Sequence, residues 1–437
     1  MGRNERKKKH HRKRQRTSSA PPASSLISPA KKKISSSSRS SGDCQELSSR
    51  ARSLWLSATS GKELRSVEQL YRRAVEIARS NLDKADDAEG NDDTPEAQFR
   101  STVEKLSLLW IQSERPELAI NDLSSLGYIC RLSSTVLDYP TQQSDVPHLT
   151  IKAIQKSLSK APCLICDDFL SPSQEIHLKK CLEDPKSSYW VDHDYCIEPP
   201  SPYFSYVISL DQISEYGFLG DLIDSIAQNS AIRHKFPKLS DAKFVELWIH
   251  NRPHASGHQL HFDSDNEGIG GVRNPIISTI VYINASSGGP SLVTNQTLKD
   301  TKLANRGYLV HPKARRVVAF DGTVLHGVIP GKDFVEVGGR RVTLMLAFWN
   351  SIRIRPSSTP GAARPFPKID EDIPDWLKYL ISYPKGGKEH SHHSNSKRQK
   401  QKLAKPIVVD RVYESLEGNA WSQDQGMPEY DEMFQGF

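Results

Sequence analysis

Two histidines and one aspartate are the residues of this chain whose types and spacing best fit metal chemistry. His261-Phe262-Asp263 forms a His-x-Asp pair, and His326 follows near the end of the same β-rich stretch. Two imidazoles and one carboxylate bind one face of a divalent iron and leave the opposite coordination positions open for a co-substrate and O2. The pattern therefore predicts an iron-dependent oxygenase.

The positions of these residues matter more than the His-x-Asp pair itself, because a chain with 15 His contains about one such pair by chance. In a strand, residues two apart point to the same face, so His261 and Asp263 are both expected inside a barrel or sandwich, with Phe262 facing the other way. His326 lies in the apolar stretch Gly322–Pro330, where a core histidine is the alternative. The upstream pair favours its interpretation as the third ligand.

The last predicted strand, Arg340–Trp349, carries a candidate anion-binding residue. Its alternation places Arg341 and Thr343 on one face, and Arg340 on the other. A buried guanidinium calls for a carboxylate partner, which its planar fork binds through two hydrogen bonds, and 2-oxoglutarate would supply one. The alternative is an exposed Arg341 paired with Glu336, and Arg340 remains the competing choice for the carboxylate.

The stretch from about Ala161 to Ile354 resembles the Fe(II)/2-oxoglutarate-dependent dioxygenases, and in particular their prolyl-hydroxylase-like branch. The order and spacing of several segments carry this resemblance: Pro162–Ser171, Phe244–His250, His261–Asp263, Ile277–Asn284, Gly288–Thr294, the His326 strand and the Arg341 strand.

The resemblance implies a role for each candidate residue. His261, Asp263 and His326 would be Fe(II) ligands, and Arg341 would hold the distal carboxylate of 2-oxoglutarate. Thr343 follows in the family's Arg-x-Ser/Thr arrangement, so Arg341 is preferred to Arg340. Further candidates are Tyr282 and Thr343 as hydroxyls that help to hold the co-substrate, and an apolar wall made of residues such as Val281, Leu292, Leu325 and Met345.

Two further histidines, His254 and His258, lie four residues apart, a spacing that would suit zinc on a helix. Pro253, Ser256 and Gly257 favour a loop instead. We interpret both histidines as polar loop residues.

The expected fold class is α+β: a double-stranded β-helix, which is a jelly-roll-like catalytic core with flanking helices, plus an N-terminal helical region and disordered tails. Eight short strands separated by Gly, Pro or Asn signals agree with this core. They span about 244–250, 257–263, 276–284, 290–294, 307–311, 315–320, 324–329 and 340–349.

Four segments follow along the chain. Residues 1–45 are expected to form a disordered basic tail, 46–145 a helical region, 150–355 the dioxygenase domain, and 356–437 a linker, a short helix at Ile373–Ile381 and a mostly disordered tail. In the helical region, apolar residues recur at three- and four-residue steps, which predicts two or three antiparallel helices. These helices would serve as a scaffold for the barrel or as a docking surface for a partner. The stripes are Leu64, Val67, Tyr71, Ala74 and Ala78, then Val103, Leu106 and Trp110.

Charge is unevenly distributed. Residues 1–40 hold 13 Lys/Arg and one Glu, a charge of +12, so the rest of the chain carries −5 of the net +7. The run Arg6–Arg16 has the density of a nuclear import signal and would also contact nucleic-acid phosphates, although a solvated tail without address function has the same composition. The expected location is the nucleus, with the cytoplasm as the alternative.

Six Cys without a regular framework indicate reduced thiols, and no apolar run approaches a membrane span.

Three functions are compatible with these features. The favoured one is hydroxylation of a protein side chain, Pro or Lys, in an unidentified partner. The second is oxidation of a nucleic-acid base. The demethylase branch places a second Arg six positions after the co-substrate Arg, and this position holds Leu346 when counted from Arg340 and Ala347 when counted from Arg341. The third is a non-catalytic barrel or helical adaptor that binds a protein partner.

Overall fold

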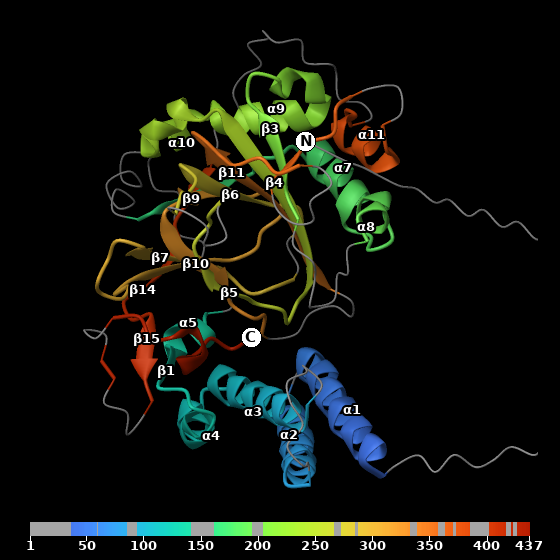
Figure 1. Cartoon of the computed structure of the whole chain (residues 1–437), viewed down its shortest axis with the longest axis vertical. Coiled ribbons are helices and arrows are strands. Elements are labelled where there is room, and N and C mark those ends of the chain that lie inside the picture. The colour runs from blue at the N-terminus through green and yellow to red at the C-terminus, as the bar shows by residue number, and fades with distance from the viewer. Residues whose placement is uncertain are drawn as a thin grey trace, which may run out of the picture.

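The computed structural model describes most of the chain and has two main sheets with helices on both sides (Figure 1). The described residues are 36–58, 60–84, 94–140, 161–194, 204–265, 272–284, 287–332, 339–356, 363–369, 373–384, 402–416, 421–422 and 426–437. The basic run at residues 6–16 lies outside them.

The larger sheet has the strand order β12-β3-β4-β11-β6-β9-β2-β13, and every neighbouring pair is antiparallel except β12 with β3. Its strands are β2 (Cys163–Asp167), β3 (Tyr206–Ser209), β4 (Phe244–Pro253), β6 (Ile277–Tyr282), β9 (Val317–Asp321), β11 (Arg340–Trp349), β12 (Arg364–Pro365) and β13 (Lys402–Ala404). The smaller, antiparallel sheet has the order β14-β8-β7-β10-β5. Its strands are β5 (His258–His261), β7 (Ser291–Thr297), β8 (Gly307–Val310), β10 (Val324–Val328) and β14 (Ile407–Val409).

All eight strands expected from the sequence are present, although β5 ends at His261 and does not reach Asp263. The chain is therefore α+β with antiparallel sheets, as predicted at that level. The register of β11 is fixed over its whole length by its pairing with β4, from Arg340 opposite Pro253 to Trp349 opposite Phe244. This register determines which side chains of β11 point to each face of the sheet. One face of the larger sheet looks toward the smaller sheet, and the other packs against helices.

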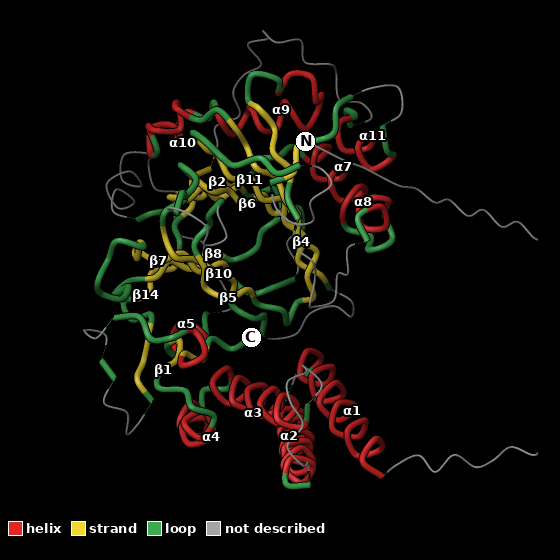
Figure 2. The backbone as a smooth tube through the Cα atoms, viewed as in Figure 1, coloured by secondary structure: helices red, strands yellow, loops and turns green. Residues whose placement is uncertain are grey.

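Helices cover the outer face of the larger sheet, as Figure 2 shows, and contribute side chains to the main hydrophobic core. They are α7 (Pro172–Leu182), α8 (Ser188–Asp192), α9 (Gly217–Ala227), α10 (Ser230–Lys235) and α11 (Asp375–Ile381). Helix α7 begins at a capping box in which Ser171 and Gln174 exchange hydrogen bonds, directly after β2. The short helix predicted at Ile373–Ile381 corresponds to α11.

The helical region lies on the other side of the molecule, beyond the smaller sheet (Figure 2). It comprises α1 (Ser36–Ser57), α2 (Gly61–Leu82), α3 (Pro95–Gln112), α4 (Ile120–Ser125) and α5 (Ser134–Leu137), together with strand β1 (Cys130–Leu132). The predicted stripe on α2 is buried at Val67, Tyr71, Ala74 and Ala78. Helix α1 begins inside residues 1–45, the segment predicted to be a disordered tail. The sequence did not indicate this helix, because its serine-rich first turns carry no apolar periodicity.

The prediction of a mostly disordered tail is wrong for residues 402–416 and 426–437. Strands β13 and β14 extend both main sheets, while β15 (Tyr413–Ser415) and β16 (Met433–Phe434) flank β1 in a third sheet. Each of these strands has only two or three residues, too few to produce a recognisable alternation, and their pairing partners lie far away in the sequence. Among the described residues, no helix is long and apolar enough to cross a membrane.

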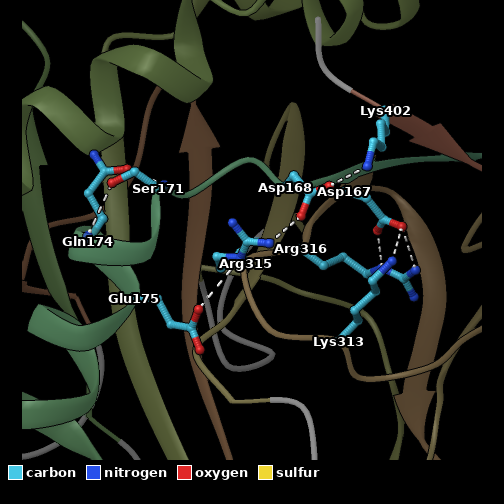
Figure 3. Close-up of polar contacts among 9 residues, drawn as sticks. All are labelled: Asp167, Asp168, Ser171, Gln174, Glu175, Lys313, Arg315, Arg316 and Lys402. Carbon is cyan, nitrogen blue, oxygen red and sulfur yellow. Dashed lines mark hydrogen bonds and ion pairs between the residues drawn. The ribbon is translucent and has the colours of Figure 1, made fainter. Parts of the chain in front are cut away.

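Ion pairs hold the edge of the larger sheet where β13 joins it (Figure 3). The Asp167 carboxylate on β2 accepts hydrogen bonds from Arg316 at 2.6 Å and from Lys313 at 2.8 Å. Asp168, at φ +52°, pairs with Arg315 and with Lys402 of β13. The tail strand is therefore attached by side-chain charges as well as by its backbone.

Candidate active site

The structure brings His261, Asp263 and His326 together, with one ligand atom from each lying within 4.8 Å of the others. The Nε2 atoms of His261 and His326 lie 3.5 and 3.6 Å from the same Asp263 oxygen, Oδ1. His261 and His326 face each other across the β5–β10 pair. Asp263 follows the strand, so the expected alternation stops at His261, and Phe262 borders the cavity instead of facing away.

Hydrogen bonds orient both imidazoles toward a shared point. Nδ1 of His261 lies 2.8 Å from the Gln259 carbonyl, and Nδ1 of His326 lies 3.0 Å from the Val324 carbonyl. A carbonyl accepts only, so each Nδ1 carries a proton, and each Nε2 presents a lone pair when its imidazole is neutral. Nε2 of His326 is buried and has no hydrogen-bond partner among the described residues. Two lone pairs and a carboxylate directed at one point fit a divalent metal.

The protonation states also suit metal binding. Burial lowers the pKa of His326 to about 4, so this imidazole is neutral at pH 7. Burial alone would raise the pKa of Asp263, but the charges of His326 and His261 and the hydroxyl of Ser278 hold it well below its usual range. Burial opposes protonation of His261, yet its hydrogen bond with Asp263 raises its pKa above the ordinary value. A metal would displace that proton, because ligand imidazoles bind in the neutral form.

A cavity of about 340 Å³ adjoins these three residues, and Arg341 lies in its wall. The Arg341 side chain is buried, with Nη2 3.1 Å from Ser291 Oγ, and its Nε has no partner among the described residues. Arg340 points away, and its guanidinium donates to the backbone and side-chain oxygens of Asn251. Of the two adjacent arginines, only Arg341 lines the cavity, as the alternation of β11 predicts.

Tyr282 and Thr343 lie next to Arg341 and do not line the cavity. The Tyr282 hydroxyl is 2.8 Å from Ser291 Oγ, and the Arg341 guanidinium lies 5.6 Å from the centre of the Tyr282 ring. Thr343 lies opposite Tyr282 in the β11–β6 pair, and its buried hydroxyl has no partner among the described residues. In this arrangement Tyr282 and Ser291 orient the guanidinium, while Ser291 itself reaches the cavity.

The predicted apolar wall is half right. Leu292 and Met345 line the cavity, but Val281 and Leu325 do not, because each points to the opposite face of its strand. Ile280, on the face opposite Val281, takes its place.

The polar residues of the cavity that sequence reasoning missed include His250, Arg252 and His258. His250 and Arg252 alternate with Trp248 on β4 and pair with Thr343 and Arg341, so the β4–β11 register was the signal that could have found them. Burial lowers the pKa of His258 to about 3 and that of His250 well below its ordinary value, so both are neutral.

His254, also interpreted as a polar loop residue, is buried and structural. Its Nδ1 accepts from the Gly288 backbone, and its Nε2 lies 3.0 Å from the Lys332 carbonyl. It thereby ties together the loops around the cavity.

No protein-family model matches this chain, and no curated protein matches it. Among solved structures, a prolyl-4-hydroxylase from Pseudomonas putida is 17% identical, covering 46% of this chain and 95% of its own, with a TM-score of 0.27. AviO1 from Streptomyces viridochromogenes Tue57 is 14% identical over 49% of this chain and 100% of its own, with a TM-score of 0.31. HygX from Streptomyces hygroscopicus, with nickel and 2-oxoglutarate bound, is 11% identical over 46% and 86%, with a TM-score of 0.27.

Proposed function

We propose that this chain is an Fe(II)- and 2-oxoglutarate-dependent dioxygenase built on a double-stranded β-helix. The observation that carries the proposal is the convergence of His261, Asp263 and His326 at one end of a cavity that also contains the buried guanidinium of Arg341. Two facing antiparallel sheets support the proposed fold, because the cavity is lined by strands of both.

In this proposal His261, Asp263 and His326 would hold Fe(II) next to the cavity that they help to line. Arg341 binds the distal carboxylate of 2-oxoglutarate, and Ser291 and Tyr282 fix the orientation of its guanidinium. When bound, the iron supplies the oxidation chemistry, which couples decarboxylation of 2-oxoglutarate to succinate and CO2 with hydroxylation of a second substrate by O2. Met345, Ile280 and Leu292 exclude water from that reaction.

The proposed prime substrate is a protein side chain, Pro or Lys, in a nuclear partner. The support is the resemblance of the sequence to the prolyl-hydroxylase-like branch and the density of Lys and Arg at residues 6–16. The basic run would concentrate the enzyme in the nucleus or near nucleic acid.

An anaerobic titration of 2-oxoglutarate into Fe(II)-loaded protein tests the proposal. We expect a saturable visible charge-transfer band, which requires the co-substrate to chelate the iron, and its loss in His326→Ala. Absence of the band in folded, iron-containing wild-type protein would exclude 2-oxoglutarate chelation. It would favour another type of oxygenase, or a binding role, for the barrel.

Oxidation of a nucleic-acid base is a second candidate, favoured by one observation. The residues that line the cavity include two arginines, Arg252 and Arg341, and the aromatic residues Trp248 and Phe262. Such rings stack on extruded bases. Succinate release stimulated by methylated single-stranded DNA, and not by prolyl peptides, would favour this candidate over protein hydroxylation.

A further inference from the structure

Strand β5, which carries His261, is weakly held by its own sheet. It is an edge strand whose pairing with β10 consists of His261 opposite His326 and His258 opposite Val328, with a register shift between them. A short edge strand with an irregular ladder is poorly specified by backbone pairing alone. The position of His261 therefore depends on contacts made at the outer edge of β5.

Gln435 provides such a contact from a distant part of the chain. The backbone N–H of Leu260, at the centre of β5, donates to Gln435 Oε1 at 2.8 Å. Both residues are buried, with Gln435 only 4% exposed. A buried N–H without an acceptor is unfavourable, so this side chain takes the place of a neighbouring strand.

The two residues after Gln435 extend the contact to the cavity rim and to the helical region. Gly436 has a φ of +85°, and a Cβ on it would lie 3.0 Å from Leu108 of α3. The Phe437 ring packs over Gly257, where an added Cβ would come within 2.2 Å of ring carbons. Because Gly257 lines the cavity, these residues join the rim of the site to the helical region.

Residues before Gln435 anchor it on the opposite side. Met433 and Phe434 form β16, which pairs in parallel with β1, and the Ile129 N–H donates to the Glu432 carbonyl at 2.9 Å. Both side chains of β16 are buried. Gln435 is therefore presented to β5 from a fixed backbone.

The helical region also holds the loops beside β5. The Arg52 guanidinium donates to the Ala255 carbonyl at 2.8 Å, in the connection between β4 and β5. After β10, the Lys332 N–H donates to the Tyr139 hydroxyl at 2.9 Å. These contacts attach both loops to residues of the helical region.

We propose that Gln435 is a positioning residue for the metal centre. It holds β5 so that His261 lies next to Asp263 and His326. It also makes the position of β5 depend on how β1, β16 and α3 pack together. The inference rests on the proposed function, because it assigns Gln435 a role in the affinity of the metal site. When fewer molecules have His261 in place before metal arrives, the apparent affinity falls by that fraction.

The test compares Gln435→Ala with Gln296→Ala as a matched control. Gln296, on β7 of the smaller sheet, is likewise a buried glutamine, 6% exposed, and its Oε1 accepts from the Ala304 N–H at 2.9 Å. It does not line the cavity. Co(II) binding to the metal-free full chain is followed by visible absorption, and hydrogen exchange of the Leu260 amide is followed by mass spectrometry.

We expect Gln435→Ala to bind Co(II) about fivefold more weakly and to exchange the Leu260 amide faster, since a lost hydrogen bond of this kind changes an equilibrium by about that factor. Gln296→Ala should retain the wild-type Co(II) affinity at a comparable loss of thermal stability. Phe437→Ala, which truncates a ring that is 43% exposed, keeps the test available if Gln435→Ala fails to fold, and should weaken Co(II) binding about twofold.

Two negative results remain distinguishable. If the wild type binds Co(II) and both Gln435→Ala and Phe437→Ala bind it equally well, the positioning role is overturned while the metal site stands. If the folded wild type binds no Co(II), the proposed metal site itself fails, and the positioning role fails with it.

Discussion

Removing the guanidinium of Arg341 tests the co-substrate site, because the neighbouring Arg340 offers a matched control. Arg341 is only 4% exposed and lines the cavity, whereas Arg340 binds oxygens of Asn251 outside it. Truncating one partner of a buried, hydrogen-bonded charge pair costs about 2–5 kcal/mol, much of it from leaving the other charge unpaired. Taking ~3 kcal/mol, we expect Arg341→Ala to weaken 2-oxoglutarate binding by a factor of about 100.

Arg340→Ala should change 2-oxoglutarate affinity by less than about threefold, since the Arg340 guanidinium binds oxygens of Asn251 and does not line the cavity. Anaerobic titration of the charge-transfer band measures both variants against the wild type, and circular dichroism controls for folding. If Arg340→Ala has the larger effect, the clamp lies one residue earlier. If neither variant weakens binding, the cavity holds the carboxylate by another group and our interpretation of β11 is wrong.

Three further predictions concern individual side chains. Asp263→Ala should lose Co(II) or Fe(II) in equilibrium dialysis and retain its circular dichroism spectrum; normal metal retention would refute the ligand assignment. Burial raises the pKa of Glu246 to about 7 in the folded chain, from an ordinary value of 4.5. This stabilising effect is therefore complete below pH 4.5 and is lost as pH rises through 7, about 3 kcal/mol in all. Wild-type Tm should fall as pH rises from 4.5 to about 7.5, and Glu246→Gln should remove most of that fall. Arg252→Ala should weaken 2-oxoglutarate binding several-fold in the same titration, an effect that shrinks at high salt, because its charge faces the cavity beside Arg341.

The part of the site that could be predicted consists of residues whose neighbours form long, regular strands. Arg341 lies at the start of the ten-residue strand β11, so its face followed from alternation alone. Asp263 was placed with His261 by the same rule although β5 ends before it. The proximity was right and its reason was not: Asp263 lies in the irregular segment after β5, where the Ser278 hydroxyl donates a hydrogen bond to its carboxylate.

The features that could not be predicted depend on contacts between distant segments. His258 was interpreted as a polar loop residue from the nearby Pro253, Ser256 and Gly257, although the strand predicted at 257–263 includes it. Its pairing with Val328 makes it the first residue of β5. The strands at residues 402–416 and 433–434 are stabilised by the edges they meet, not by their own composition. A single sequence records local preference, and such short strands have almost none.

The position of the helical region bears on whether it acts independently as an adaptor. Its apolar residues share one core with the smaller sheet, since Leu106 and Leu109 belong to the same buried cluster as Leu260, Leu292 and Leu325. Strand β1 has its partners β15 and β16 only when residues 413–434 are present. Residues 46–145 on their own would expose that apolar face and leave β1 unpaired, which is unfavourable for a free-standing adaptor. Because Gln435 connects β16 to the strand of His261, a partner that shifted the helices would alter the candidate metal centre directly.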